Sequence, residues 1–159
     1  MAVVESGLST LEVLFGYAAE TVAGQKPAAF TCLERCNNIS GIALSTENID
    51  ASALEDKVTK YVAGRQDSSG TWTVTFNLTD ETTTQLEAMI EAYETAKANN
   101  LRMWFEVYHP YMDNGFFVVA QPPKVIPMPE FGQNSLLTVD IEFIIEEYVG
   151  QDTAIAPTV

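Results

Sequence analysis

Residues 136–148, LLTVDIEFIIEEY, decide the fold class of this chain. Every odd-numbered position from Leu137 to Ile145 is apolar, whereas the even-numbered positions are polar or acidic except for Ile144. Because successive side chains of a strand point to opposite faces, this alternation predicts a strand with one buried and one solvated face, as in an antiparallel sheet. The strand is about 13 residues long, against a usual 5 or 6. Its polar face is a column of acids without a basic partner.

Two further elements precede this strand. Residues 71–78 alternate between large apolar side chains and small polar ones, three threonines and Asn77, which predicts another half-buried strand. Residues 79–100 predict the one helix of the chain, because four apolar residues between Leu86 and Tyr93 recur at the spacing of a single helical face. Thr79 or Asp80 can cap its start, and Asn99-Asn100 can end it in the left-handed conformation.

Between the helix and the final strand we expect two strands, residues 101–108 and 115–120, joined by a turn that contains His109. Residues 122–129 carry four prolines, which confine that segment to a sheet edge or an extended crossing. Earlier in the chain, the apolar runs 29–35 and 39–44 flank Asn37-Asn38, which predicts a hairpin.

Two segments lack a clear pattern. Residues 45–70 are rich in small polar and acidic residues, and we interpret them as a long loop with one or two helical turns within 52–61. Loops of this length inside a compact domain are uncommon and usually either functional or disordered. Residues 1–29 have helix-like apolar spacing, but Gly16 and Gly24 argue against a stable helix.

The whole chain of 159 residues suits a single domain with one core. We expect an N-terminal arm (1–29), a β-barrel core (30–148) with its helix at about 80–99 and its long loop at 45–70, and a C-terminal arm (149–159). The predicted fold class is therefore mainly β, an antiparallel sandwich or barrel with one flanking helix and extended arms at both ends.

The charge balance restricts the partners. Twenty-two Asp and Glu face eight Lys and Arg, for a net charge of −14, and Lys124 is the only base after Arg102. Such a surface repels phosphates, and the cluster of bases that nucleic-acid binding requires is absent from the sequence. The N-terminus has no basic region and is interrupted by Glu5, Glu12 and Glu20, so it predicts neither a signal peptide nor a membrane-spanning helix.

The sequence offers little for chemistry. Cys32 and Cys36 would lie about 13 Å apart on one strand, too far for a disulfide, and favour a reduced, cytoplasmic setting. His109 is a lone turn histidine. Asp140 and Glu142 would be about 7 Å apart on one strand face, a spacing that glycosidases use, but no aromatic side chain lines that face before Tyr148. We therefore expect no enzyme, no catalytic residue, no metal and no cofactor.

The order of these elements resembles the major tail tube proteins of long-tailed, siphovirus-like bacteriophages. The resemblance runs from about residue 30 to 150. It rests on ENIDASALEDKV, GRQDSSGTW, LTDETTTQLEAMIEAYETAK, RMWFEVYHP, FFVVAQPP, IPMPEFGQN and LLTVDIEFIIEEY. The stretch from FEVYHP to IPMPEFGQN is the most specific part, and Gly64-Arg65 before Asp67 and Gly70 is similar to the loop-to-strand junction of the family.

The resemblance implies a compact β-barrel or sandwich whose subunits close into rings, expected to be hexamers, that stack into a hollow tube for double-stranded DNA. The partners implied are further copies of the chain, the tape measure protein, and the tail terminator and tip proteins, without a membrane. The implied location is the virion tail, assembled in the cytoplasm of the bacterial host.

Three sets of residues are assigned to this function. Acids that repel the DNA backbone, and so let DNA slide through the lumen, are Asp140, Glu142 and Glu146, with Glu106 as an addition. Candidates for contacts between subunits or rings are Asp50, Leu54, Glu55, Lys57, Lys60, Tyr61 and Arg65. Candidate contacts of the N-terminal arm are Leu11, Leu14 and Phe15.

Two alternatives stay open from the residues alone. Trp104, Tyr108 and Tyr111 near the turn could form a sugar-binding platform, which would make the chain a carbohydrate-binding β-sandwich. The tube could also belong to a contractile phage-like particle or a secretion system, because the subunits of these assemblies share an architecture.

Overall fold

The computed structural model describes residues 6–159, and within this range the chain forms nine strands and one helix. In chain order these are β1 (Leu14–Ala19), β2 (Thr31–Leu33), β3 (Cys36–Ile39), β4 (Ser45–Asp50), β5 (Tyr61–Asp67), β6 (Thr71–Asn77), α1 (Asp80–Ala98), β7 (Met103–Tyr108), β8 (Asn114–Gln121) and β9 (Thr138–Thr153). Seven strands form one sheet in the order β2-β1-β7-β8-β9-β6-β3, and β4 and β5 form a separate pair. All of these strand pairs are antiparallel, so the predicted fold class is confirmed.

The connection between β2 and β3 forces the sheet to curl. These strands are its two outer strands, yet only Glu34 and Arg35 join them. Two residues bridge at most about 11 Å, whereas the edges of a flat sheet of seven strands would lie about 29 Å apart. The sheet therefore curls until its edges approach, although it stays open between them, and Arg35 makes the link with a left-handed φ of 60°.

The hairpin predicted around Asn37-Asn38 is wrong. Strands form on both sides of Arg35, but β2 pairs with β1 and β3 pairs with β6. The local turn signal was outweighed by pairing with strands that are distant in the sequence.

The core lies inside the curl and is dominated by aromatic side chains. The ring centroids of Phe105 and Phe143 are 4.6 Å apart, and Phe15 stacks on Phe105 at 5.7 Å. Helix α1 completes this core with Leu86, Met89, Ile90 and Tyr93, the four residues that the periodicity predicted.

The helix ends also agree with the sequence-based prediction. The Thr79 hydroxyl accepts a hydrogen bond from the Thr82 N–H, and the Thr82 side chain bonds back to the Thr79 N–H, which completes a capping box. Asn100 follows the helix with a left-handed φ of 57°.

Strand β9 is long because its first part pairs with one neighbouring strand and its second part pairs with another. Residues Thr138 to Ile144 pair with β6, and Ile144 to Thr153 pair with β8, with two register shifts along the second pairing. The proposed C-terminal arm is thus wrong in its first half, since residues 149–153 belong to the sheet. Thr158 makes an isolated parallel bridge to Thr31 at the edge of β2.

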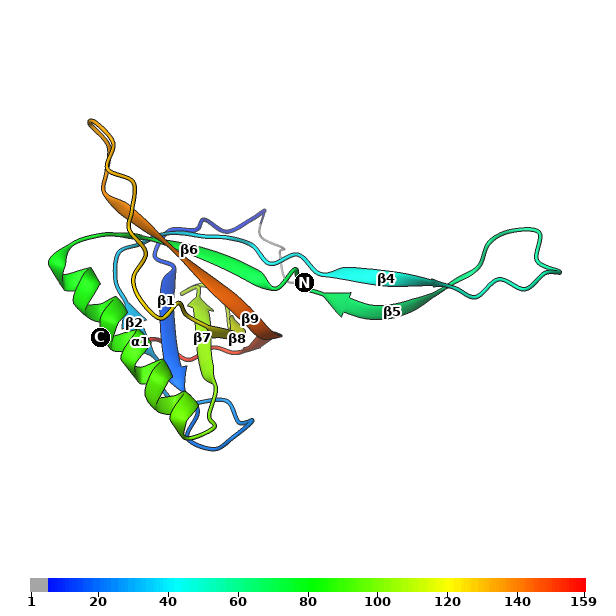
Figure 1. Cartoon of the computed structure of the whole chain (residues 1–159), viewed down its shortest axis with the longest axis horizontal. Coiled ribbons are helices and arrows are strands. Elements are labelled where there is room, and N and C mark those ends of the chain that lie inside the picture. Colours follow the sequence, from blue (N-terminus) through cyan, green and yellow to red (C-terminus); the bar gives the residue numbers. More distant parts are fainter. Residues whose placement is uncertain (1–5) are drawn as a thin grey trace.

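The other two boundaries are corrected as well. Strand β1 lies within the proposed N-terminal arm, and it sits inside the sheet between β2 and β7. The proposed loop 45–70 is a twisted β-hairpin, β4 and β5, that projects far from the body opposite the helix (Figure 1). No helical turn forms within residues 52–61.

Candidate functional site

Three of the predicted acids lie on strand β9: Asp140 and Glu142 share its outer face, and Glu146 lies at the register shift between Ile145 and Glu147. Asp140, Glu142 and Glu146 are all exposed, and we call these three residues the acidic face. Their polar neighbours come from adjacent strands: the Thr75 hydroxyl donates to Asp140 at 2.7 Å, and the Gln121 amide donates to Glu146. The cross-strand partner of Glu142 is Thr73, so the acidic face continues into a row of threonines on β6.

Glu106 is not part of the acidic face, which corrects the prediction for this residue. Its side chain is completely buried, so it cannot line a channel. Burial raises the pKa of Glu106 to about 7, although a backbone hydrogen bond from Ile155 and the charge of Lys26 act in the opposite direction. One of its carboxylate oxygens, Oε2, has no hydrogen-bond partner among the described residues.

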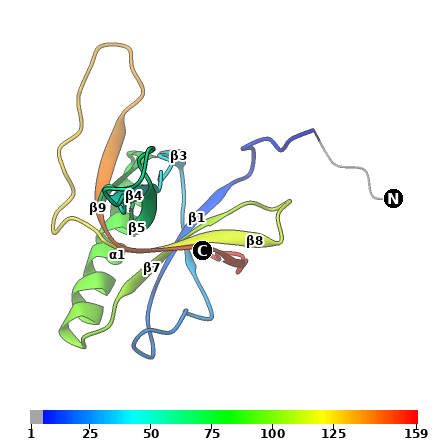
Figure 2. The ribbon, with the colours of Figure 1, turned by 90° about the vertical axis from the view of Figure 1, so that its right-hand side faces the viewer.

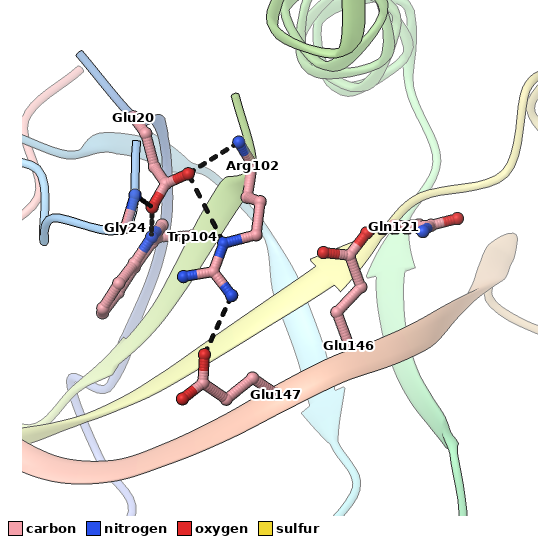
Figure 3. Close-up of polar contacts among 7 residues, drawn as sticks. All are labelled: Glu20, Gly24, Arg102, Trp104, Gln121, Glu146 and Glu147. Atoms are coloured by element: carbon pink, nitrogen blue, oxygen red, sulfur yellow. Dashed lines mark hydrogen bonds and ion pairs between the residues drawn. The ribbon is translucent and has the colours of Figure 1, made fainter. Parts of the chain in front are cut away.

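A second buried carboxylate, Glu20, is fully partnered and was not found from the sequence (Figure 3). It accepts hydrogen bonds from the backbone N–H groups of Gly24 at 3.0 Å and Arg102 at 2.7 Å, and from the Trp104 indole at 3.0 Å. The Arg102 guanidinium lies 3.5 Å from Glu20 and also pairs with Glu147 at 2.9 Å. Burial alone would raise the pKa of Glu20, but the bonds from Trp104 and Arg102 hold it below its usual value.

This network connects three parts of the fold. Glu20 follows β1, Arg102 precedes β7, and Glu147 lies on β9. One usable hint was present in the sequence, a glutamate next to apolar residues. Its partner could not be identified because Arg102 is more than eighty positions away.

The predicted contact residues of the long loop all lie on the hairpin formed by residues 45–67, which we call the hairpin arm. Every one of them is exposed: Asp50, Leu54, Glu55, Lys57, Lys60, Tyr61 and Arg65. No residue of the arm is buried. The arm exposes apolar side chains at its end, with Leu54 and Val58 exposed by 108% and 75%.

The end of the hairpin arm is held by local polar contacts. Asp50 accepts a hydrogen bond from the Ser52 N–H at 2.9 Å, and Asp56 accepts one from the Ala53 N–H at 2.8 Å. These backbone bonds lower the pKa of both carboxyl groups. Lys60 pairs with Asp56 at 3.1 Å, and Lys57 is the cation of the tip that has no carboxylate of residues 6–159 within 4 Å.

A second exposed segment joins β8 to β9. Residues 122–137 form a long loop that extends beyond the body in both views (Figures 1 and 2). It exposes four large apolar side chains, Val125, Met128, Phe131 and Leu136. Like Leu54 and Val58, these side chains are not covered by any other part of the described chain.

The N-terminal candidates fall into two groups. Phe15 is completely buried in the core, so its prediction as an arm contact is wrong. Leu11 and Leu14 remain exposed, by 71% and 36%. His109 contacts this segment through a hydrogen bond, because its Nε2 lies 2.6 Å from the Ser9 carbonyl oxygen.

The proposed sugar platform does not form. Trp104 is only 6% exposed and packs at 6.3 Å against Phe117, so its ring is not available to a ligand. Tyr108 is half-buried, and only Tyr111 is well exposed.

A groove of about 500 Å³ lies beside the open edge of the sheet, between β3 and the N-terminal segment. Its lining includes Cys36, Trp72 and His109. Burial raises the pKa of the Cys36 thiol to about 12, which makes this thiol a poor nucleophile. Both cysteines are free.

Within residues 6–159, no cluster of three His, Cys, Asp or Glu side chains is arranged to hold a metal ion. In the same range, α1 is not apolar enough to cross a membrane.

No family model and no curated protein matches the chain. Solved structures with a similar fold include a chain of the anti-feeding prophage (AFP) baseplate, from a six-fold symmetrised cryo-EM structure, with a TM-score of 0.56. That chain is 10% identical over 96% of this chain and 98% of its own length. A chain from the tail of an empty GTA particle, computed with C6 symmetry, gives a TM-score of 0.57 and 13% identity over 93% of this chain and 99% of its own. At such low identity the likeness establishes a shared fold.

Proposed function

We propose that this chain is the repeating structural subunit of a phage-type tail tube, assembled as stacked rings of six copies. The observation that carries the proposal is the likeness of fold over nearly the full length of both chains, from two particles with six-fold symmetry. The order of sequence elements supports the same class independently, through its resemblance to tail tube proteins of non-contractile, long-tailed phages.

The hairpin arm supports assembly because it has no cover within its own chain. A two-stranded hairpin is at best marginally stable in water, and this one exposes Ile49, Leu54, Val58, Tyr61 and Val62. A neighbouring copy would cover these side chains and the unpaired strand edges. Because the arm and helix α1 lie on opposite sides of the body, the contact would be head-to-tail, which produces rings or stacks (Figure 1).

The acidic face is assigned to the lumen of the tube. Asp140, Glu142 and Glu146 are exposed acids on β9 that would repel the phosphate backbone, so double-stranded DNA would pass without binding tightly. Glu106 has no part in this lining. The tape measure protein and the terminator and tip proteins are the further partners proposed, in the virion tail.

Negative-stain electron microscopy of the purified chain, concentrated at moderate salt, tests the proposal. We expect hollow tubes or stacked rings of uniform width with six-fold averages. Particles seen only as monomers, both after purification and in fresh lysates of the expressing cells, would contradict the proposed function.

A further inference from the structure

The outer face of the sheet carries a second buried cluster, separate from the main core. Phe30, Trp104, Phe117 and Val119 form it. Trp104 alternates along β7 with Phe105 of the main core, so the two side chains point to opposite faces. A sheet face that is exposed elsewhere therefore has one apolar region that needs a cover.

The last residues of the chain supply that cover. Residues 154–159, which we call the strap, are held at the edge of β2 by two backbone hydrogen bonds. The Cys32 N–H donates to the Thr158 carbonyl at 2.7 Å, and the Thr158 N–H donates to the Phe30 carbonyl at 3.0 Å. Pro157 packs on Gly16 so closely that a Cβ at Gly16 would lie 2.9 Å from it.

Glu106 lies under the strap and is bonded to it. Its Oε1 accepts a hydrogen bond from the Ile155 N–H at 3.2 Å, while Oε2 has no partner in the described chain. Its neighbours across the strands are Gly16 on β1 and Phe117 on β8, neither of which titrates. Near the start of β8, a Cβ at Gly115 would lie 3.1 Å from Oε1, so the carboxyl is closely packed.

One charged group, Lys26, acts on this carboxyl, and Lys26 is itself paired with Asp152. Lys26 lies 4.1 Å above the Phe117 ring, donates to the Thr153 carbonyl at 2.6 Å and pairs with Asp152 at 3.4 Å. The charge of Lys26 is therefore shared with Asp152 and does not supply Oε2 with a hydrogen bond. An ionised Glu106 would hold a buried charge with one oxygen unsatisfied, which is costly unless water can reach it.

We propose that the strap is a releasable cover and that the protonation state of Glu106 controls whether it opens. The protonated carboxyl favours the closed strap, and the ionised carboxyl favours the open strap. Opening hydrates Glu106, uncovers the Phe30 and Phe117 side chains and frees the edge of β2. The proposal does not depend on tube assembly.

The direction of the pH effect follows from linkage. The pKa of Glu106 is raised to about 7 with the strap closed, and it returns toward the ordinary 4.5 once water reaches the carboxyl. The closed state then binds more protons than the open state between these two values. The ratio of closed to open molecules falls as pH rises through this window, by at most about tenfold per pH unit, and levels off above it.

Amide hydrogen exchange of the monomer, measured by NMR between pH 5 and 8, tests the proposal. Protection factors correct for the intrinsic pH dependence of exchange and report the opening of each bond. We expect the protection of the Thr158 amide to fall about tenfold or more between pH 5 and 7 and then to level off. The Val118 amide in the middle of the sheet serves as the internal reference, and its protection should not follow this curve.

Three variants complete the design. In E106Q the Thr158 protection should be independent of pH, because the titrating group is gone. E20Q removes another buried carboxylate that does not touch the strap, so the wild-type curve should persist. G16A forces Pro157 away and shows the protection of an opened strap at all pH values.

The proposal is overturned if Thr158 protection stays level from pH 5 to 8 in the wild type, or if E106Q shows the same fall as the wild type. Should E106Q not fold, the wild type decides alone. The carbon-13 shift of the Glu106 side-chain carboxyl must then titrate with its midpoint near the pH where Thr158 protection levels off. A carboxyl that titrates in the ordinary range would also overturn the proposal.

Discussion

The sheet body buries five phenylalanine side chains to less than 2% exposure, whereas the hairpin arm buries no side chain at all. Both are built from antiparallel strands, and both contain bulges. The body therefore carries the folding energy of the monomer, since hydrophobic burial is the main favourable term. The arm adds exposed apolar surface without such a gain. In the proposed assembly, a neighbouring chain would cover this surface.

Deleting residues 50–63 is the strongest test of whether the arm serves assembly and not the stability of the monomer. The arm makes no contribution to the core, so we expect the shortened monomer to unfold at nearly the same urea concentration as the wild type. Tube formation should be abolished, as seen by electron microscopy and sedimentation. Tubes of normal length from the shortened chain would remove the hairpin arm from the assembly contacts.

A substitution that keeps the arm but removes its apolar tip sharpens the deletion. In the variant with Leu54→Ser and Val58→Ser, we expect a folded monomer whose assembly is strongly weakened. The matched control is Val125→Ser with Met128→Ser, two exposed apolar residues on the loop before β9. Equal effects of both pairs would mean that the two exposed segments act together in assembly.

Removing an aromatic side chain from the core of the body should have the converse effect, a large loss of monomer stability. Phe105→Ala should lower the free energy of unfolding by about 3–5 kcal/mol, because Phe105 contacts Phe15, Trp72 and Phe143 in the closed core. Ile49→Ala on the arm should change it by no more than about 0.5 kcal/mol. Urea unfolding of both variants measures the difference. A loss of several kcal/mol for Ile49→Ala would mean that the arm contributes to monomer stability.

The same contrast explains what could be predicted from the sequence. Strand β6 and helix α1 were predicted because each buries one face. Burial of one face produces a two-residue alternation in the strand and a 3.6-residue period in the helix, and both can be recognised within a short stretch of sequence. The hairpin arm has two solvated faces and thus no such pattern. Strand β1 was missed because its local spacing resembles a helix. Its strand conformation is determined by pairing with β7, nearly ninety residues later.

Burial of acids on the outer face was unpredictable for a related reason. Glu106 lies on the face opposite to Phe105, as the alternation of side chains along a strand requires. Whether that face is solvated depends on the strap, which lies about fifty positions away, and on the segment around Lys26. Sequence periodicity can assign a side chain to a face, but what covers the face is decided by tertiary contacts.

Glu20 offers a smaller effect, with a pH dependence opposite to that of Glu106. Its pKa is lowered in the folded chain, so its contribution to stability is present above the ordinary pKa of 4.5 and is lost as pH falls through the folded value. E20Q should lower the free energy of unfolding by about 1–3 kcal/mol at pH 7, because the Arg102 and Trp104 donors lose their charged acceptor. Below pH 4 the difference from the wild type should shrink. A difference that stays constant from pH 3 to 7 would contradict this role of Glu20.

Substitutions on the acidic face should also have a small effect on the monomer. Asp140, Glu142 and Glu146 are exposed, so changing all three to Lys should alter the free energy of unfolding by no more than about 1 kcal/mol, the scale of surface substitutions. The same variant reverses the charge that DNA would meet in the proposed lumen. Particles assembled from it should keep normal tails but eject DNA poorly, which infectivity measures.

The matched control for that variant lies on helix α1, where Glu87, Glu91 and Glu94 are also exposed. Changing these three residues to Lys shifts the net charge by the same amount on a surface not assigned to the lumen. Loss of infectivity in the β9 variant alone supports a channel lined by the acidic face, because only that position changes the interaction with the phosphate backbone. Equal loss in both variants would point to total charge, and unchanged infectivity in both would place the acidic face on the exterior.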